Sequence, residues 1–70
     1  MTLEDIGFNY LGTCACAGRP ERWVNDKRME VKKWKTGAWK LLRGGFLVRY
    51  GSDPNSIVSE VQEYMNQNNL

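Results

Sequence analysis

The fold is decided by residues 29–50, which read MEVKKWKTGAWKLLRGGFLVRY. Apolar and polar residues alternate within residues 29–35, 38–43 and 46–50, as is typical of strands that bury one face. Thr36-Gly37 and Gly44-Gly45 separate these segments, and two-residue connections that contain glycine favour tight hairpin turns. The stretch therefore predicts three antiparallel strands joined by two hairpins.

Two-residue loops would determine which residues of neighbouring strands lie opposite each other. Lys33 is then expected opposite Lys40, and Lys40 opposite Arg49. This register divides the side chains between two faces of the sheet. One face is expected to hold the aromatic and apolar residues Trp34, Trp39, Leu41, Phe46, Val48 and Tyr50. The other face is expected to hold Lys33, Lys35, Lys40 and Arg49, with Val31, Leu42 and Leu47 beyond them.

The residues before this stretch predict one or two further strands. Residues 8–17 alternate with the period of a strand, and Gly12 suggests a bend or a bulge. Gly18 and Pro20 then favour a turn, because proline lacks the amide proton that a strand ladder needs. Residues 21–24 form a short extended segment that ends at a polar turn over residues 25–27.

The last element is predicted to be a helix. Asp53 is a good N-cap, and Pro54 suits the first helical position, where its missing amide proton costs nothing. An apolar stripe follows at helical spacing, formed by Ile57, Val58, Val61, Tyr64 and Met65. The sequence thus predicts a single α+β domain over residues 1–70, in which a four- or five-stranded antiparallel β-meander has one C-terminal amphipathic helix packed on its aromatic face.

Basic charge is concentrated in the middle of the chain, where all ten lysine and arginine residues lie between Arg19 and Arg49. Such a surface commonly binds polyanions, including the phosphates of nucleic acid. The predicted polyanion-binding residues are Lys33, Lys35, Lys40 and Arg49. Lysines can also simply keep a small sheet with exposed edges soluble. Because the expected register puts the aromatic residues on the other face, phosphate contacts rather than base stacking would have to carry nucleic-acid binding, unless Trp23 is exposed nearby.

An apolar patch of Val31, Leu42 and Leu47 is expected on the basic face. An apolar cluster that faces water often marks an interface, although a strand from the first part of the chain could also cover it. The patch supports a second hypothesis, a protein-interaction module that pairs with a second copy of the chain or with another protein.

No catalytic residue, cofactor or metal site is predicted. The chain has no histidine and its carboxylates are scattered, so no acid–base pair can be named, and we do not expect an enzyme. Cys14 and Cys16 would point to one face of a strand about 7 Å apart, which is poor geometry for a disulfide. They are best interpreted as small core residues. Two thiols are too few for a structural zinc site, although two copies of the chain could share a metal ion.

The N-terminal segment has no basic and apolar pattern of a secretory signal, and no apolar run is long enough for a membrane helix. A cytoplasmic protein without membrane contact is therefore expected. The segment Tyr10-Leu11-Gly12-Thr13-Cys14-Ala15-Cys16, followed by a basic loop, two hairpins and a closing helix, resembles small uncharacterised bacterial proteins carried by prophages and other mobile elements. This resemblance covers most of the chain and implies no activity.

Overall fold

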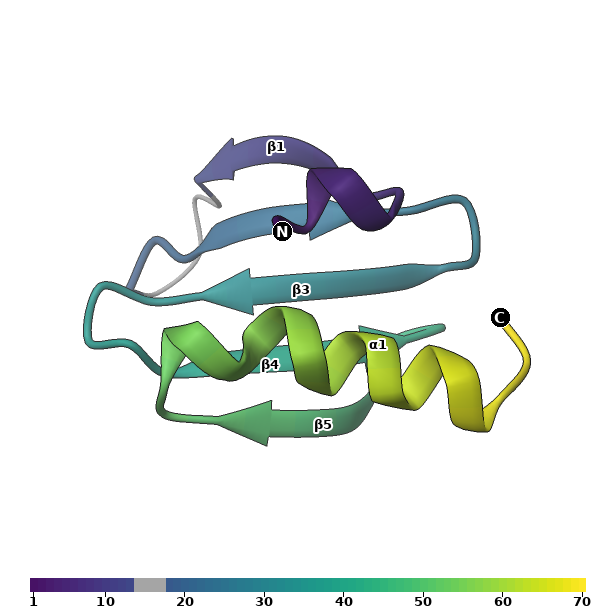
Figure 1. The fold of residues 1–70 in the computed structure, drawn as a ribbon. Helices are drawn as coiled ribbons and strands as arrows, with labels where there is room; N and C mark the ends of the chain where they lie inside the picture. Colours follow the sequence, from purple (N-terminus) through teal and green to yellow (C-terminus); the bar gives the residue numbers. More distant parts are fainter. Residues whose placement is uncertain (14–17) are drawn as a thin grey trace.

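Five antiparallel strands form the sheet of the computed structural model, which describes residues 1–13 and 18–70 (Figure 1). The strands are β1 (Asn9–Thr13), β2 (Glu21–Val24), β3 (Met29–Lys33), β4 (Trp39–Arg43) and β5 (Phe46–Gly51), and they neighbour one another in chain order. A short 3₁₀ helix, η1 (Glu4–Ile6), precedes them. A 3₁₀ turn, η2 (Pro54–Ser56), and the helix α1 (Ile57–Gln67) follow them. The predicted α+β meander with one C-terminal helix is confirmed.

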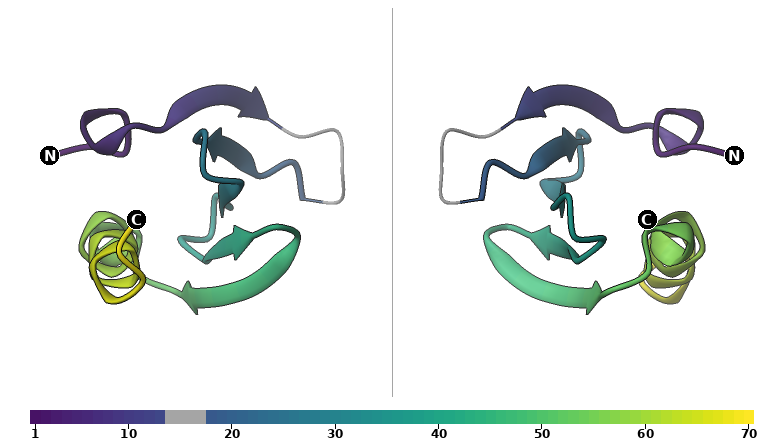
Figure 2. Two further views of the ribbon diagram at one scale, coloured as in Figure 1. Left: turned by 90° about the vertical axis from the view of Figure 1, so that its right-hand side faces the viewer. Right: turned by 90° about the vertical axis from the view of Figure 1, so that its left-hand side faces the viewer.

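Both α1 and η1 lie on the same side of the sheet, which we call the covered face (Figure 2). In the described part of the chain the opposite face carries no helix, and we call it the open face. The core lies beneath the helices and contains Leu3, Phe8, Met29, Val31, Trp39, Leu41, Ile57, Val61 and Tyr64. None of the helices of the described residues is long and apolar enough to cross a membrane.

Trp39 anchors the start of the helical segment to the sheet. Its side chain is 1% exposed, and its indole Nε1 donates a hydrogen bond to the backbone oxygen of Asp53 at 3.1 Å. Gly51 packs directly against the indole, because a Cβ atom at this glycine would lie 2.8 Å from Nε1. The chain can therefore pass close to the ring only because residue 51 has no side chain.

The predicted N-cap of the helix, Asp53, is confirmed, but the helical segment begins with the 3₁₀ turn η2 before α1. The Asp53 carboxylate accepts a hydrogen bond from the backbone N–H of Asn55 at 3.0 Å, and Pro54 opens the 3₁₀ turn that leads into α1. The predicted apolar stripe faces the core. Ile57, Val61 and Tyr64 are buried, and Val58 and Met65 pack against the core at its margin.

Within the predicted segment 8–17 the structure describes residues up to Thr13, and Asn9–Thr13 form β1. The rest of the segment, with Cys14 and Cys16, lies outside the described residues. The predicted irregularity at Gly12 is confirmed, because the register between β1 and β2 shifts between Tyr10 and Gly12. The short segment 21–24 is confirmed as β2.

The hairpin between β3 and β4 differs from the prediction by one residue. The backbone N–H of Trp34 donates to the oxygen of Ala38 at 2.8 Å, and the N–H of Gly37 donates to the oxygen of Trp34 at 3.0 Å. Residues 35–37 therefore form a three-residue loop, in which Gly37 takes a left-handed conformation with a φ of 97°. This combination is the usual geometry of three-residue hairpins. The prediction of a two-residue Thr36-Gly37 loop is wrong.

The hairpin between β4 and β5 begins as predicted and then changes register. Leu42 lies opposite Leu47, and Arg43 opposite Phe46, so Gly44-Gly45 is the expected two-residue loop. A bulge at Val48 then shifts the pairing by one residue. As a result Tyr50, rather than Arg49, lies opposite Lys40.

These two shifts redistribute side chains between the faces, because a one-residue slip turns a side chain to the other side of a sheet. Val31 lies opposite Leu41 and is 0% exposed beneath the helices. Trp39, Leu41 and Val48 belong to the covered side, as predicted. Trp34 and Tyr50, which were predicted to share that side, instead lie on the open face, where the Lys40 ammonium lies over the Trp34 ring and Tyr50 is opposite Lys40.

Candidate functional site

The four predicted polyanion-binding residues do not lie on one face. Lys40 is exposed on the open face, and Lys35 is exposed in the loop beside it. Lys33 lies opposite Trp39 on the covered face, where its ammonium is 3.8 Å from the carboxylate of Glu21. The bulge turns Arg49 to the same face. The predicted opposition of Lys33, Lys40 and Arg49 is therefore wrong.

Arg49 is engaged by the C-terminal helix. Its guanidinium carbon lies 5.2 Å from the ring centroid of Tyr64, and its Nη2 donates to Oε1 of Gln67 at 2.7 Å. A cation over an aromatic ring is favourable, and the hydrogen bond holds it in place. Arg49 thus fastens α1 to the sheet edge and is not free to receive a ligand on the open face.

A different basic row crosses the open face. Arg22 of β2 lies opposite Lys32 of β3, Lys32 opposite Lys40 of β4, and Lys40 opposite Tyr50 of β5. Among residues 1–13 and 18–70, Lys32, Lys35 and Lys40 form no ion pair. Arg22 does form one, with the carboxylate of Glu30 on the same face. We call Arg22, Lys32 and Lys40 the basic row.

Two aromatic side chains flank the end of the basic row. The ammonium of Lys40 lies 5.6 Å from the ring centroid of Trp34, and Tyr50 is 75% exposed. Together with Ala38, Trp39 and Gly51 they line a recess of ≈ 300 Å³. Cationic and aromatic groups therefore meet at one open site, where the expected register had placed them on opposite faces.

The predicted apolar patch is reduced to two residues. Leu42 and Leu47 lie directly opposite each other on the open face, and Leu47 is 49% exposed. Val31 belongs to the core and is removed from the patch. The apolar character of this face continues through Tyr50 rather than through Val31.

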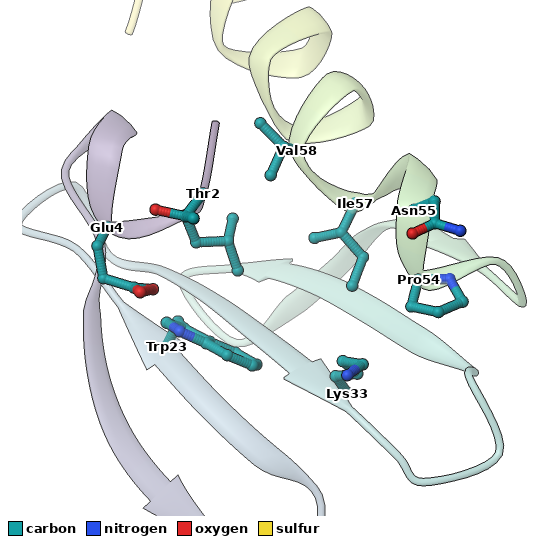
Figure 3. A pocket seen from close by; sticks show the side chains of 9 residues that line it. Thr2, Glu4, Trp23, Lys33, Pro54, Asn55, Ile57 and Val58 are labelled. Atoms are coloured by element: carbon teal, nitrogen blue, oxygen red, sulfur yellow. The ribbon is translucent and has the colours of Figure 1, made fainter.

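A second hollow, of ≈ 380 Å³, lies on the covered face between the N-terminal segment and the start of α1 (Figure 3). Trp23 and Lys33 reach it from the sheet, and Ile57 and Val58 reach it from the helix. Glu4 also lines it, and Lys33 is already beside Glu21. The carboxylates offset the lysine, so this hollow has less attraction for an anion than the open face.

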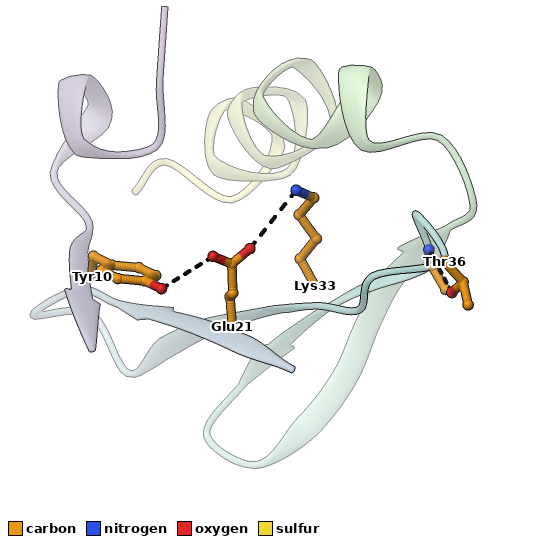
Figure 4. A network of polar contacts seen from close by, with 5 residues as sticks. Tyr10, Glu21, Lys33 and Thr36 are labelled. Carbon is orange, nitrogen blue, oxygen red and sulfur yellow. Dashed lines mark hydrogen bonds and ion pairs between the residues drawn. The ribbon is translucent and has the colours of Figure 1, made fainter. Parts of the chain in front are cut away.

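Tyr10, Glu21 and Lys33 form a polar chain across three strands (Figure 4). The Tyr10 hydroxyl donates to Oε1 of Glu21 at 3.1 Å, and Oε2 of Glu21 faces the Lys33 ammonium. This hydrogen bond to Glu21 is the main cause that raises the pKa of Tyr10 above its ordinary value, and burial and the carboxylate charge act in the same direction. The tyrosine is therefore held in its neutral form.

We expect Glu21→Ala to lower the pKa of Tyr10 towards its ordinary value, because alanine removes both the acceptor of the hydrogen bond and the charge that opposes the phenolate. The raised pKa means that this contact stabilises the fold below the ordinary tyrosine pKa, and that the contribution is lost as the pH rises through the raised value. Titration of tyrosinate absorbance measures the shift, and Tyr10→Phe identifies which of the three tyrosines is observed. An unchanged titration curve in Glu21→Ala would contradict the assigned cause.

The described residues contain no group of three or more His, Cys, Asp or Glu side chains that could hold a metal ion. The fold and its surface define the chain as a small α+β domain with one helix-covered face and one basic and aromatic open face. Comparison of the chain with protein-family models, curated proteins and solved structures finds no match.

Proposed function

We propose that the chain is a non-enzymatic accessory module that binds nucleic acid or another polyanion through the open face of its sheet. The observation that carries this proposal is the direct opposition of Lys32 and Lys40 in the ladder, extended by Arg22 on the next strand. Like charges placed opposite each other destabilise a sheet by roughly 0.2–1 kcal/mol. A bound anion reverses this cost, which gives the arrangement a purpose beyond solubility.

The positions of the acidic residues also favour binding of an anion at the open face. Glu60 and Glu63 lie on α1, Asp53 caps the helical segment, and Glu4 and Asp5 lie in η1, all away from the open face. On the open face, Glu30 is already paired with Arg22. Most acidic side chains thus lie on the covered side, where they offset Lys33 and Arg49, whereas basic side chains predominate on the open face, and this separation favours approach of a polyanion to the open face.

The test is binding of fluorescently labelled oligonucleotides and of heparin, followed by anisotropy across a salt series. We expect binding at low salt that weakens steeply, because each neutralised phosphate contributes a slope of about −0.7 to −0.9 in log K against log salt. Lys40→Glu should abolish binding. Lys27→Glu is the matched control, since Lys27 is exposed in the turn before β3, at the other end of that strand from Trp34. No detectable binding of either polymer at low salt contradicts the proposal.

A second candidate function is protein interaction through the same face, with a second copy of the chain as the simplest partner. The supporting observation is that Leu42 and Leu47 lie directly opposite each other on the open face, and that Leu47 is 49% exposed. Large apolar side chains that gather on a surface often mark an interface. Light scattering that finds only a monomer at high protein concentration contradicts the homodimer.

The cytoplasmic location and the resemblance to proteins of mobile elements stay predictions from the sequence. Neither is needed for the binding proposal, which depends only on the charges and side chains of the open face.

A further inference from the structure

The recess on the open face has an aromatic lining beside a lysine, and binding of a phosphate alone would need only the lysine. Its lining is mostly aromatic and apolar, with Trp34 on one side, Tyr50 on the other and Ala38 between them. Lys40 supplies the single ammonium at its rim. A polyanion without flat apolar groups, such as heparin or polyphosphate, would use the lysine and leave the rings unused.

The strand pairing explains why the recess exists. Trp34 is paired with Ala38 across the hairpin, and Tyr50 lies opposite Lys40 on the next strand. Trp34 directly follows β3 and Tyr50 belongs to β5, so the two side chains come from either side of β4. Ala38, which also lines the recess, has too short a side chain to fill it. A planar group can therefore enter beside either ring.

From this geometry we propose that the preferred ligand is single-stranded nucleic acid, whose bases stack on Tyr50 and Trp34 while Lys32 and Lys40 contact its phosphates. This inference rests on the proposed polyanion-binding function and names the ligand within that class. In a duplex the faces of the bases are stacked on one another inside the helix, so the rings of Trp34 and Tyr50 cannot stack on them. In a single strand they are accessible, and aromatic stacking tolerates any base.

The Lys40 side chain does not block the proposed stacking. It is exposed, and its ammonium approaches the Trp34 ring without an ion pair to any described residue. A cation over a ring at an exposed site contributes only about 0.5–1 kcal/mol. The flexible lysine can therefore move from the ring to a phosphate when a base takes its place.

The test compares three labelled ligands of equal length at one salt concentration, namely an oligothymidylate, a strand with the same phosphates but abasic sugars, and a duplex. We expect the oligothymidylate to bind most tightly. Tyr50→Ala should weaken its binding roughly 5- to 150-fold, since a stacked base contributes about 1–3 kcal/mol. Binding of the abasic strand should not change. Phe46→Ala is the matched control, because Phe46 is as exposed as Tyr50 but lies opposite Arg43 at the hairpin end.

A second measurement follows the tryptophan directly. Oligothymidylate should quench the intrinsic fluorescence of the protein, and Trp34→Phe should remove most of the quenching, because Trp39 is buried in the core and Trp23 lies on the covered face. Tyr50 and Trp34 are outside the core cluster, so circular dichroism should find both variants folded.

The outcomes separate the inference from the proposal on which it rests. Equal affinity for the oligothymidylate and the abasic strand, with no effect of Tyr50→Ala, overturns base stacking while salt-dependent polyanion binding stands. Absence of binding to every polyanion overturns both. A dimer that buries Tyr50, detected as self-association that Tyr50→Ala abolishes, also overturns the inference.

Discussion

Trp39→Ala should lower the free energy of unfolding by about 3–5 kcal/mol, the usual cost of removing a large aromatic side chain from a core. The indole is 1% exposed, packs against Gly51 and donates a hydrogen bond to the backbone of Asp53. A chain of 70 residues has in total only about 4–10 kcal/mol of stability. We therefore expect the variant to be largely unfolded at physiological temperature, which thermal and urea denaturation followed by circular dichroism will measure.

Trp34→Ala is the matched control for this prediction. Trp34 is only half-buried and lies on the open face, where no described helix covers it. We expect a loss of about 1 kcal/mol or less, as for most substitutions outside the core. Equal losses at the two tryptophans would mean that both belong to the core, as the two-residue Thr36-Gly37 loop implies, and would contradict the register of the first hairpin.

The parts of the fold that the sequence predicts well are those set by local chemistry. Asp53 and Pro54 predict the start of the helical segment, because a side-chain cap and a missing amide proton act within one turn. Gly44-Gly45 predicts a two-residue loop that the structure contains. The apolar stripe of α1 follows from the helical period alone. None of these features depends on the rest of the molecule.

The register of the sheet could not be predicted with the same certainty. A glycine in the left-handed conformation suits both a two-residue loop and the last position of a three-residue loop, so Thr36-Gly37 is compatible with either. The packing decides between them, because only the longer loop places Val31 opposite Leu41 beneath the helix. Val48 poses a similar problem, since a bulge leaves no clear mark on the alternation of β5.

The covering of the sheet by the N-terminal segment was also missed. Leu3 and Phe8 belong to the core, but they flank the short η1 helix rather than repeat with the period of a strand or a long helix. A pattern of two isolated apolar residues around Glu4, Asp5 and Ile6 does not distinguish a covering turn from a solvated end.

For the candidate site, the sequence predicts that a basic surface exists, but it does not predict which basic side chains lie on it. The concentration of lysine and arginine in the middle strands indicates a basic surface, and Lys40 lies on it. Lys33 and Arg49 were assigned to the same face through the wrong register, and Lys32 and Arg22 were missed for the same reason. Met29 and Val31 are apolar and alternate with Glu30 and Lys32. This alternation alone places Lys32 on the face opposite Met29 and Val31.

Val31→Asp should prevent folding at neutral pH, with an expected loss above about 4 kcal/mol. Val31 is 0% exposed between Trp23 and Leu41, its neighbours in the ladder, so the new carboxylate would be buried without a charged partner. Such burial is among the few single changes that cost this much. Because the carboxylate can instead be protonated, the loss should diminish as the pH is lowered, which thermal denaturation over a pH series will measure.

Leu42→Asp provides the comparison on the other side of the same hairpin. Leu42 is half-buried on the open face, opposite Leu47, where water can solvate a carboxylate. We expect a loss of about 1 kcal/mol or less and a folded protein at neutral pH. The register expected from the sequence puts Val31 and Leu42 in one apolar patch, and with that register the two substitutions would have similar effects. A stable Val31→Asp would restore that patch, whereas unfolding confined to Val31→Asp places the two residues on opposite faces of the sheet.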